Sequence, residues 1–151
     1  MIKRLEKYEC RALLSHNYIG YLSYIFNNRP YTIPITYYYD KIRDYIIGYS
    51  GNGQKIKAMR NNNSVSLQVA EINSVNHWKS VLVHGIYREF QGNAAQINLH
   101  RFSEGVKEIV KNIENKNLHY ISEFSSKIYK EGLPIVFQIE IEDLTGKERN
   151  F

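Results

Sequence analysis

The stretch YIIGYSGNGQKIKAMRNNNSVSLQV, Tyr45 to Val69, decides the fold because it combines four local signals in a short length. An apolar run predicts a strand, and three glycines then fall within six residues. The segment Gln54–Asn61 has helical spacing, with Ile56 and Met59 on its inner side. Apolar and polar residues alternate over 64–69, which predicts the next strand. The stretch therefore predicts a strand, a glycine-rich turn, a short helix and a second strand.

The glycine-rich turn is a candidate binding site for an anion. A turn that opens a helix presents backbone N–H groups, and Lys55, Lys57 and Arg60 add positive charge nearby. The turn lacks the Gly-Lys-Ser/Thr of a Walker loop and the spacing of a GxGxxG loop, which argues against an ordinary NTPase or Rossmann module. The alternative is a plain loop-to-helix turn with solvated lysines.

Composition favours one domain, residues 1–151, because 151 residues with 43% hydrophobic content can bury one sizeable core. No apolar run approaches the ~20 residues of a membrane span, and no signal-type block opens the chain, so we expect a cytoplasmic protein without a membrane segment. The single cysteine, Cys10, is expected to be a buried apolar residue. The net charge of +5 suits an anionic ligand, but the cations are dispersed and no nucleic-acid motif occurs, which makes nucleic acid an unlikely partner.

Strand signals continue before this stretch. The runs Tyr18–Phe26 and Tyr31–Tyr39 are joined by a turn that contains Asn27 and Asn28, and asparagine tolerates positive φ, so the pattern predicts a hairpin. Pro34 lies inside the second run and removes a backbone donor. We expect an edge strand, a bulge, or a place where something replaces the neighbouring strand.

Helix signals flank the strands. The segment Lys3–Ser15 has an apolar stripe that includes Leu5 and Tyr8, and residues 93–130 fit one or two further helices. A fifth strand from His77 is expected to bend at Gly85. A last strand after residue 133 alternates an apolar face, which carries Phe137, with an outward face that carries Val136 and the acidic residues. Together these signals predict a mainly β (β+α) fold arranged as an antiparallel barrel.

Candidate catalytic and metal-binding groups are few. The five histidines are scattered, with no HExxH motif and no serine in a nucleophile elbow, so no metal site is expected and the catalytic residues stay unassigned. Glu140 and Glu142 share the outward face of the last strand and are expected to form a solvated rim.

Five stretches, in order, resemble one known family. The chain resembles the FMN-binding split barrels related to pyridoxamine 5'-phosphate oxidase, most closely the nitroimidazole-resistance subgroup. The stretches are ECRALLSHNYIGYLSY, RPYTIPITYYYD, YIIGYSGNGQKIKAMRNNNSVSLQV, WKSVLVHGIYREF and FQIEIEDLTGKERNF. The resemblance covers nearly the whole chain and implies an antiparallel six-stranded split β-barrel with flanking helices.

The resemblance also implies a cofactor and its site. Such proteins hold FMN in a cleft between the two subunits of a homodimer, with its phosphate at the turn of this chain and its ring beside the proline-containing strand. The residues placed near FMN in this way are Pro34, Ile35, Thr36, Tyr37, Tyr49, Ser50, Gly51, Lys55, Trp78, Lys79 and Ser80. Among them, Tyr37, Tyr49 and Trp78 are the candidates for lining the substrate side.

The implied function is a flavin-dependent oxidoreductase that acts on a small oxidised substrate. Tyr49 stands where many nitroimidazole-resistance relatives have a histidine, and tyrosine does not titrate near neutrality. FMN binding therefore carries over more directly than nitro-group reduction. Two alternatives remain open: a non-enzymatic barrel that binds flavin or haem, for which His84 and His100 are available, and a small RNA-binding barrel.

Overall fold

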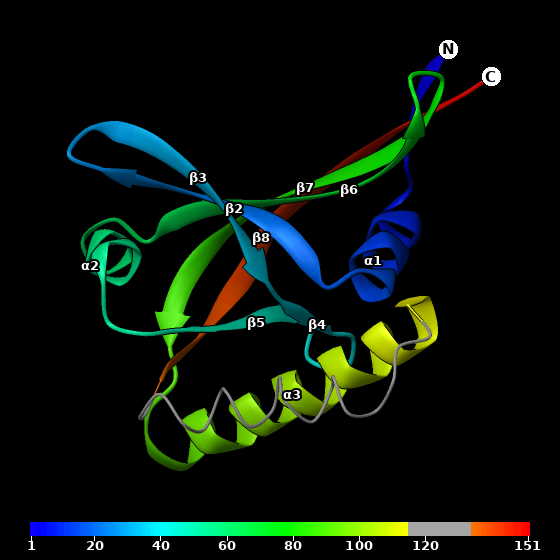
Figure 1. Cartoon of the computed structure of the whole chain (residues 1–151). Helices are drawn as coiled ribbons and strands as arrows, with labels where there is room; N and C mark the ends of the chain where they lie inside the picture. Colours follow the sequence, from blue (N-terminus) through cyan, green and yellow to red (C-terminus); the bar gives the residue numbers. More distant parts are fainter. Residues whose placement is uncertain (115–133) are drawn as a thin grey trace.

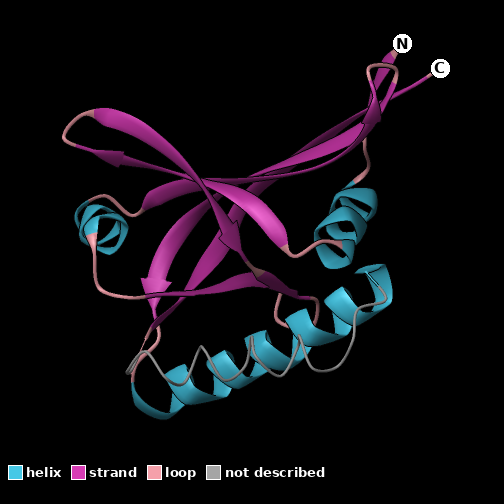
Figure 2. Cartoon of the chain, in the orientation of Figure 1, coloured by secondary structure: helices cyan, strands magenta, loops and turns pink. Residues whose placement is uncertain are grey.

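The computed structural model describes residues 1–114 and 134–151 and shows a mainly β fold with helices around a curled sheet (Figures 1 and 2). The elements in chain order are β1 (Ile2–Arg4), α1 (Lys7–His16), β2 (Ile19–Phe26), β3 (Arg29–Thr36), β4 (Tyr38–Asp40), β5 (Tyr45–Ser50), α2 (Gln54–Asn61), β6 (Ser64–Ser74), β7 (His77–Glu89), α3 (Gly92–Glu114) and β8 (Ile135–Asn150). The expected β+α split-barrel class is confirmed.

All strand pairs in the described residues are antiparallel, and together they make one open sheet of eight strands. The order is β3-β2-β6-β7-β8-β5-β4, and β1 pairs with β8 outside this path. The expectation of six strands was therefore too low. The predicted run Tyr31–Tyr39 divides into β3 and β4 at Tyr37, and β1 is an additional strand.

The division at Tyr37 determines the shape of the sheet. β3 and β4 lie at the two ends of the strand order, yet Tyr37 alone separates Thr36 from Tyr38 in the chain. One residue spans only about 3.5 Å, so the sheet has to curl until its two edges meet. We call this passage of the chain from β3 to β4 the crossing at Tyr37. The backbone N–H of Tyr37 donates to the carbonyl of Tyr18 at 2.8 Å, which holds the crossing in place.

The interior of the curled sheet contains the larger of two hydrophobic clusters, which α1 and α2 help to close. Cys10 is fully buried there, as expected. Ile56 and Met59 of α2 are also fully buried, as their helical spacing predicted. The alternation in the following strand is confirmed as well, because Val65 and Leu67 are buried in the same cluster.

The second cluster lies between α3 and the outer face of β5 and β8. Phe102 and Val106 of α3 pack with Ile47 of β5 and Val136 of β8. The prediction that Val136 belongs to an outward, solvated face was wrong, because α3 covers that part of β8 and leaves Val136 only 3% exposed. Figure 1 shows α3 running along the side of the sheet formed by β4 and β5.

The N-terminal segment differs from its prediction. The helix begins at Lys7 rather than at Lys3, because residues 2–4 form a strand on β8. β5 pairs with residues 135–140 of β8. The same edge of β8 is therefore free at residues 147–149, where β1 pairs with it. Tyr8, expected on the apolar stripe, is 73% exposed, because the buried face of α1 carries Cys10, Leu13 and Leu14 instead.

Three local predictions about turns and edges are confirmed. Asn27 and Asn28 have φ values of 50° and 60° in the β2–β3 turn. The pairing of β7 with β8 changes register between His84 and Gly85, which is the expected bulge. Pro34 lies on β3, which is an edge strand and pairs with β2 on one side. The backbone donor that proline lacks is therefore not needed for pairing with a strand on the other side.

The long helical region is confirmed as α3 up to Glu114. The predicted helical positions Ile121, Phe124 and Ile128 lie outside the described residues. Within the described part of the chain, no helix has both the length and the apolar character that crossing a membrane requires.

The bulge glycine supplies a test of this architecture. A Cβ at Gly85 would lie 2.4 Å from the backbone oxygen of Glu140 and 2.6 Å from the side chain of Ile139. We expect Gly85→Ala to lower the free energy of unfolding by about 1–3 kcal/mol, measured by urea denaturation, because the added methyl group overpacks the β7–β8 contact.

The matched control is Gly51→Ala, since a Cβ at Gly51 would meet no atom within 4 Å. Its free energy of unfolding should stay within about 0.5 kcal/mol of the original value. Equal stability of the two variants would contradict the described contact between β7 and β8.

Candidate functional site

The glycine-rich turn leaves β5 at Ser50 and enters α2 at Gln54. Ser50 is buried, and its hydroxyl donates to the carbonyl of Gly51 at 2.8 Å. Gly53 is the N-cap residue and has no side chain with which to cap the helix. The first N–H groups of a helix have no acceptor within the helix, so this helix start offers donors to an anion.

Lys55 lies in the first turn of α2 and is half-buried. Burial lowers the pKa of its ammonium group. Among the described residues no carboxylate forms an ion pair with it. A bound anion would compensate this desolvated charge, so Lys55 and the uncapped helix start together have the chemistry of a phosphate site.

The two other cations predicted near the turn have different surroundings. A hollow of about 510 Å³ beside the turn is lined by Asn52, Gly53, Lys57, Arg60 and Asn61, and Lys55 is not part of its lining. The guanidinium of Arg60 is paired with the carboxylate of Glu89, at 2.5 Å from Nε and 3.1 Å from Nη2. Lys57 is exposed, so Lys55 is the half-buried lysine of α2.

The proline-containing strand places its residues at the sheet edge. Pro34 is exposed, and Ile35 and Thr36 are half-buried. The side chain of Tyr37, expected on the substrate side, is instead fully buried, and its hydroxyl donates to the carbonyl of Leu14 at 2.8 Å. Burial raises the pKa of Tyr37. Its side chain therefore closes the C-terminal turn of α1, whose last carbonyls have no helical partners.

Tyr49 is half-buried, and its ring lies edge-on to Phe102 of α3 with 5.1 Å between the ring centroids. The ring belongs to the cluster between α3 and β5. This position gives Tyr49 a packing role that its place in the sequence pattern did not indicate.

The remaining predicted residues lie at the start of β7, beside the β6–β7 turn. Trp78 and Ser80 are half-buried, and the ammonium of Lys79 lies 3.7 Å from the carboxylate of Glu148. Trp78 pairs across the sheet with Arg149, whose Nε is buried without a hydrogen-bond partner among the described residues. Arg149 was not predicted as a site residue, because only the β7–β8 register places it beside Trp78.

One chain does not bring these groups together. Figure 1 shows α2 on one side of the sheet and the β6–β7 turn on the other, next to the chain termini. The turn residues 50–55 and the segment 78–80 are therefore separated by the width of the molecule. A ligand that contacts both would need a second copy of the chain.

The histidines and acidic residues form no evident metal centre. In residues 1–114 and 134–151, no group of three or more His, Cys, Asp and Glu side chains is arranged to hold a metal ion. His84 lines a hollow of about 470 Å³ over β2, β6 and β7, whereas His100 is on α3. The two histidines therefore belong to different surfaces.

Comparisons with known proteins agree with this architecture. A family model described as pyridoxamine 5'-phosphate oxidase matches residues 6–148. An uncharacterized protein of Rhizobium meliloti is 28% identical over an alignment that covers 97% of this chain and 94% of that protein.

Two solved structures have a similar fold. A FAD-binding protein from Mesorhizobium loti is 25% identical, with a TM-score of 0.77 over 100% of this chain and 98% of that one. A proposed 5-nitroimidazole antibiotic resistance protein from Bacteroides thetaiotaomicron is 13% identical, with a TM-score of 0.69 over 98% of this chain and 89% of that one.

The role of Tyr37 can be tested by removing one atom. Tyr37→Phe leaves the buried carbonyl of Leu14 without its donor, and we expect the free energy of unfolding to fall by about 1–3 kcal/mol in urea denaturation. Tyr8→Phe is the control, because Tyr8 is 73% exposed. If both variants unfold at the same denaturant concentration, the hydrogen bond to α1 does not contribute as described.

Proposed function

Because the chain belongs to the pyridoxamine 5'-phosphate oxidase family, we propose that it is a homodimeric flavoprotein that binds FMN between its subunits and acts as an oxidoreductase on a small oxidised substrate. The observation that carries the proposal is the half-buried ammonium of Lys55, which has no ion-pair partner in the described chain and stands at an uncapped helix start. An FMN phosphate would accept bonds from this ammonium and from the N–H groups of the turn.

The residues proposed to hold FMN have distinct tasks. Ser50, Gly51 and Lys55 bind the phosphate, and the backbone of Pro34–Tyr37 lies along the ring. Bound flavin supplies hydride or electron transfer, and the protein supplies binding, orientation and exclusion of water. Pro34 supports this arrangement because it lies on an edge strand, where backbone groups are not all engaged by a second neighbour.

A shared site between two subunits is supported by two features. The turn and the segment 78–80 lie on opposite sides of one chain, so an FMN that contacted both would take one of them from a second chain. An exposed face of the sheet also carries large apolar side chains, from 37% to 49% exposed: Ile19, Tyr21, Ile25 and Leu82. Exposed apolar side chains that gather on one face are typical of an interaction site. Tyr21 and Leu82 are joined across the sheet through Gln68, so they form one row.

The first test is flavin binding by the purified protein. We expect flavin absorption bands, or their appearance on addition of FMN, and FMN fluorescence quenching with a measurable Kd. Lys55→Met should weaken FMN binding by about tenfold or more, because hydrogen bonds to charged groups contribute about 1.5–3 kcal/mol. The flavin-free variant should be at least as stable as the original, since methionine removes a desolvated charge.

Lys57→Met is the matched control, because Lys57 lies two positions further along α2 and is exposed. Its FMN affinity should change much less. A larger loss of FMN affinity in Lys57→Met than in Lys55→Met would indicate that the phosphate binds in the neighbouring hollow lined by Lys57. Failure of both FMN and FAD to bind, or a haem Soret band in place of flavin bands, would contradict the proposed cofactor.

The second test asks whether two chains share one site. Lys55→Met and Trp78→Ala chains should each bind FMN weakly. After unfolding and refolding as an equal mixture, heterodimers should contain one intact site, so roughly a quarter of all sites recover tight binding. No recovery in the mixture, or a monomer in light scattering with FMN bound, would show that the site belongs to one chain.

A further inference from the structure

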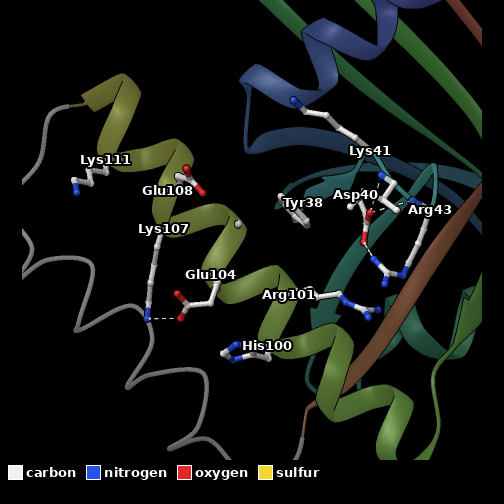
Figure 3. A pocket seen from close by; sticks show the side chains of 12 residues that line it. Tyr38, Asp40, Lys41, Arg43, His100, Arg101, Glu104, Lys107, Glu108 and Lys111 are labelled. Carbon is white, nitrogen blue, oxygen red and sulfur yellow. Dashed lines mark hydrogen bonds and ion pairs between the residues drawn. The ribbon is translucent and has the colours of Figure 1, made fainter.

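A second candidate site lies between α3 and the β4–β5 turn, away from the turn that opens α2. The cavity there has a volume of about 710 Å³, which is within the range of small-molecule sites. Figure 3 shows side chains from α3 and from residues 38–43 around it. Neither the proposed phosphate residues nor the segment 78–80 lines this cavity.

The β4–β5 turn holds Arg43 in a defined position. Asp40 is only 4% exposed, and its carboxylate accepts the N–H groups of Ile42 and Arg43 at 3.0 and 3.1 Å. The same carboxylate accepts Nη1 of Arg43 at 3.0 Å. One guanidinium nitrogen of Arg43 is therefore anchored, and the turn is ordered before any ligand arrives.

Arg101 supplies a second guanidinium from the opposite wall. Figure 3 shows its side chain extending from α3 toward Arg43, and both residues line the cavity. In the described part of the chain, Arg101 forms no ion pair. Asp40 compensates Arg43 but not Arg101. An anion between the two guanidinium groups would pair with Arg101 and accept hydrogen bonds from the nitrogens of Arg43 that Asp40 does not engage.

The remaining charges leave the cavity positive. Of its acidic lining residues, Asp40 is already paired with Arg43, and Glu104 is paired with Lys107 at 3.3 Å. Lys41 and Lys111 also line the cavity, against one further carboxylate, that of Glu108. The positive groups therefore outnumber the acidic groups around this space.

Tyr38 gives the cavity an aromatic surface. A Cβ at Gly105 would lie 2.2 Å from the ring of Tyr38, so the absence of a side chain at position 105 lets the ring rest against α3. The ring is half-buried and lines the cavity beside the two arginines. A flat ring on a ligand would stack on this surface, as aromatic groups do in offset pairs.

We propose that this cavity binds a small aromatic phosphate monoester of mononucleotide size. The phosphate would lie between Arg43 and Arg101, and the ligand ring would lie against Tyr38. This site goes beyond the proposed flavin function, because its residues are not those that would hold FMN.

The test measures AMP binding by calorimetry at low ionic strength, with one equivalent of FMN per chain so that the α2 turn is occupied and no free FMN competes for the cavity. AMP should bind in a saturable manner. Arg101→Gln should weaken AMP binding about tenfold, which is the loss of one charge-assisted contact. Tyr38→Leu should weaken AMP binding but leave the affinity for ribose 5-phosphate unchanged. Arg4→Gln is the control, because it removes the same charge from an exposed position on β1 and should bind AMP normally.

Circular dichroism and urea denaturation would establish that each variant is folded, and Arg101→Lys, which keeps the charge, should bind AMP with intermediate affinity. Two outcomes would overturn the proposal: no saturable AMP binding at millimolar concentration, or equal affinity in the original protein and Arg101→Gln. AMP binding that Lys55→Met abolishes would place AMP at the α2 turn and would also overturn it. If the chain binds no flavin, the same titration without FMN still tests this cavity.

Discussion

The crossing at Tyr37 is the constraint on which the rest of the structure depends. The chain leaves one edge of the sheet at Thr36 and joins the other edge at Tyr38, so the sheet cannot stay flat. Tyr37 secures the crossing with its backbone N–H on Tyr18 and its hydroxyl on Leu14. A single buried residue thus connects the two sheet edges and the end of α1. It closes the barrel through the covalent chain, without a ladder between β3 and β4.

The curled sheet creates an inside and an outside with different tasks. The inside is filled by the larger apolar cluster, and the outside of β5 and β8 is covered by α3. β5 therefore has both faces buried, with Ile46 inside and Ile47 outside, and its end is held firmly where the glycine-rich turn begins. This support positions Ser50 and the start of α2, which are the basis of the proposed phosphate site.

Positive charge is distributed unevenly over this frame. Most described cations with short contacts to carboxylates are on the surface, where such pairs contribute little. Lys55 and Arg101 are different, because each lies at a proposed site and neither has an ion-pair partner in the described chain. The net charge of +5 favoured an anionic ligand but did not indicate where on the protein it would bind. The structure offers two candidate locations for an anion, one at the start of α2 and one between α3 and the β4–β5 turn.

Local features could be predicted from the sequence because they depend on neighbouring residues along the chain. The helix Gln54–Asn61, the Asn27-Asn28 turn and the bulge at Gly85 follow from periodicity and backbone preference, and the ordered motifs identified the family. Tertiary structure decided the rest. Whether residues 2–4 form a strand depends on the free edge of distant β8, and the packing of Tyr37 and Tyr49 depends on α1 and α3. The α3 cavity likewise joins residues about 60 positions apart, a proximity that no local pattern encodes.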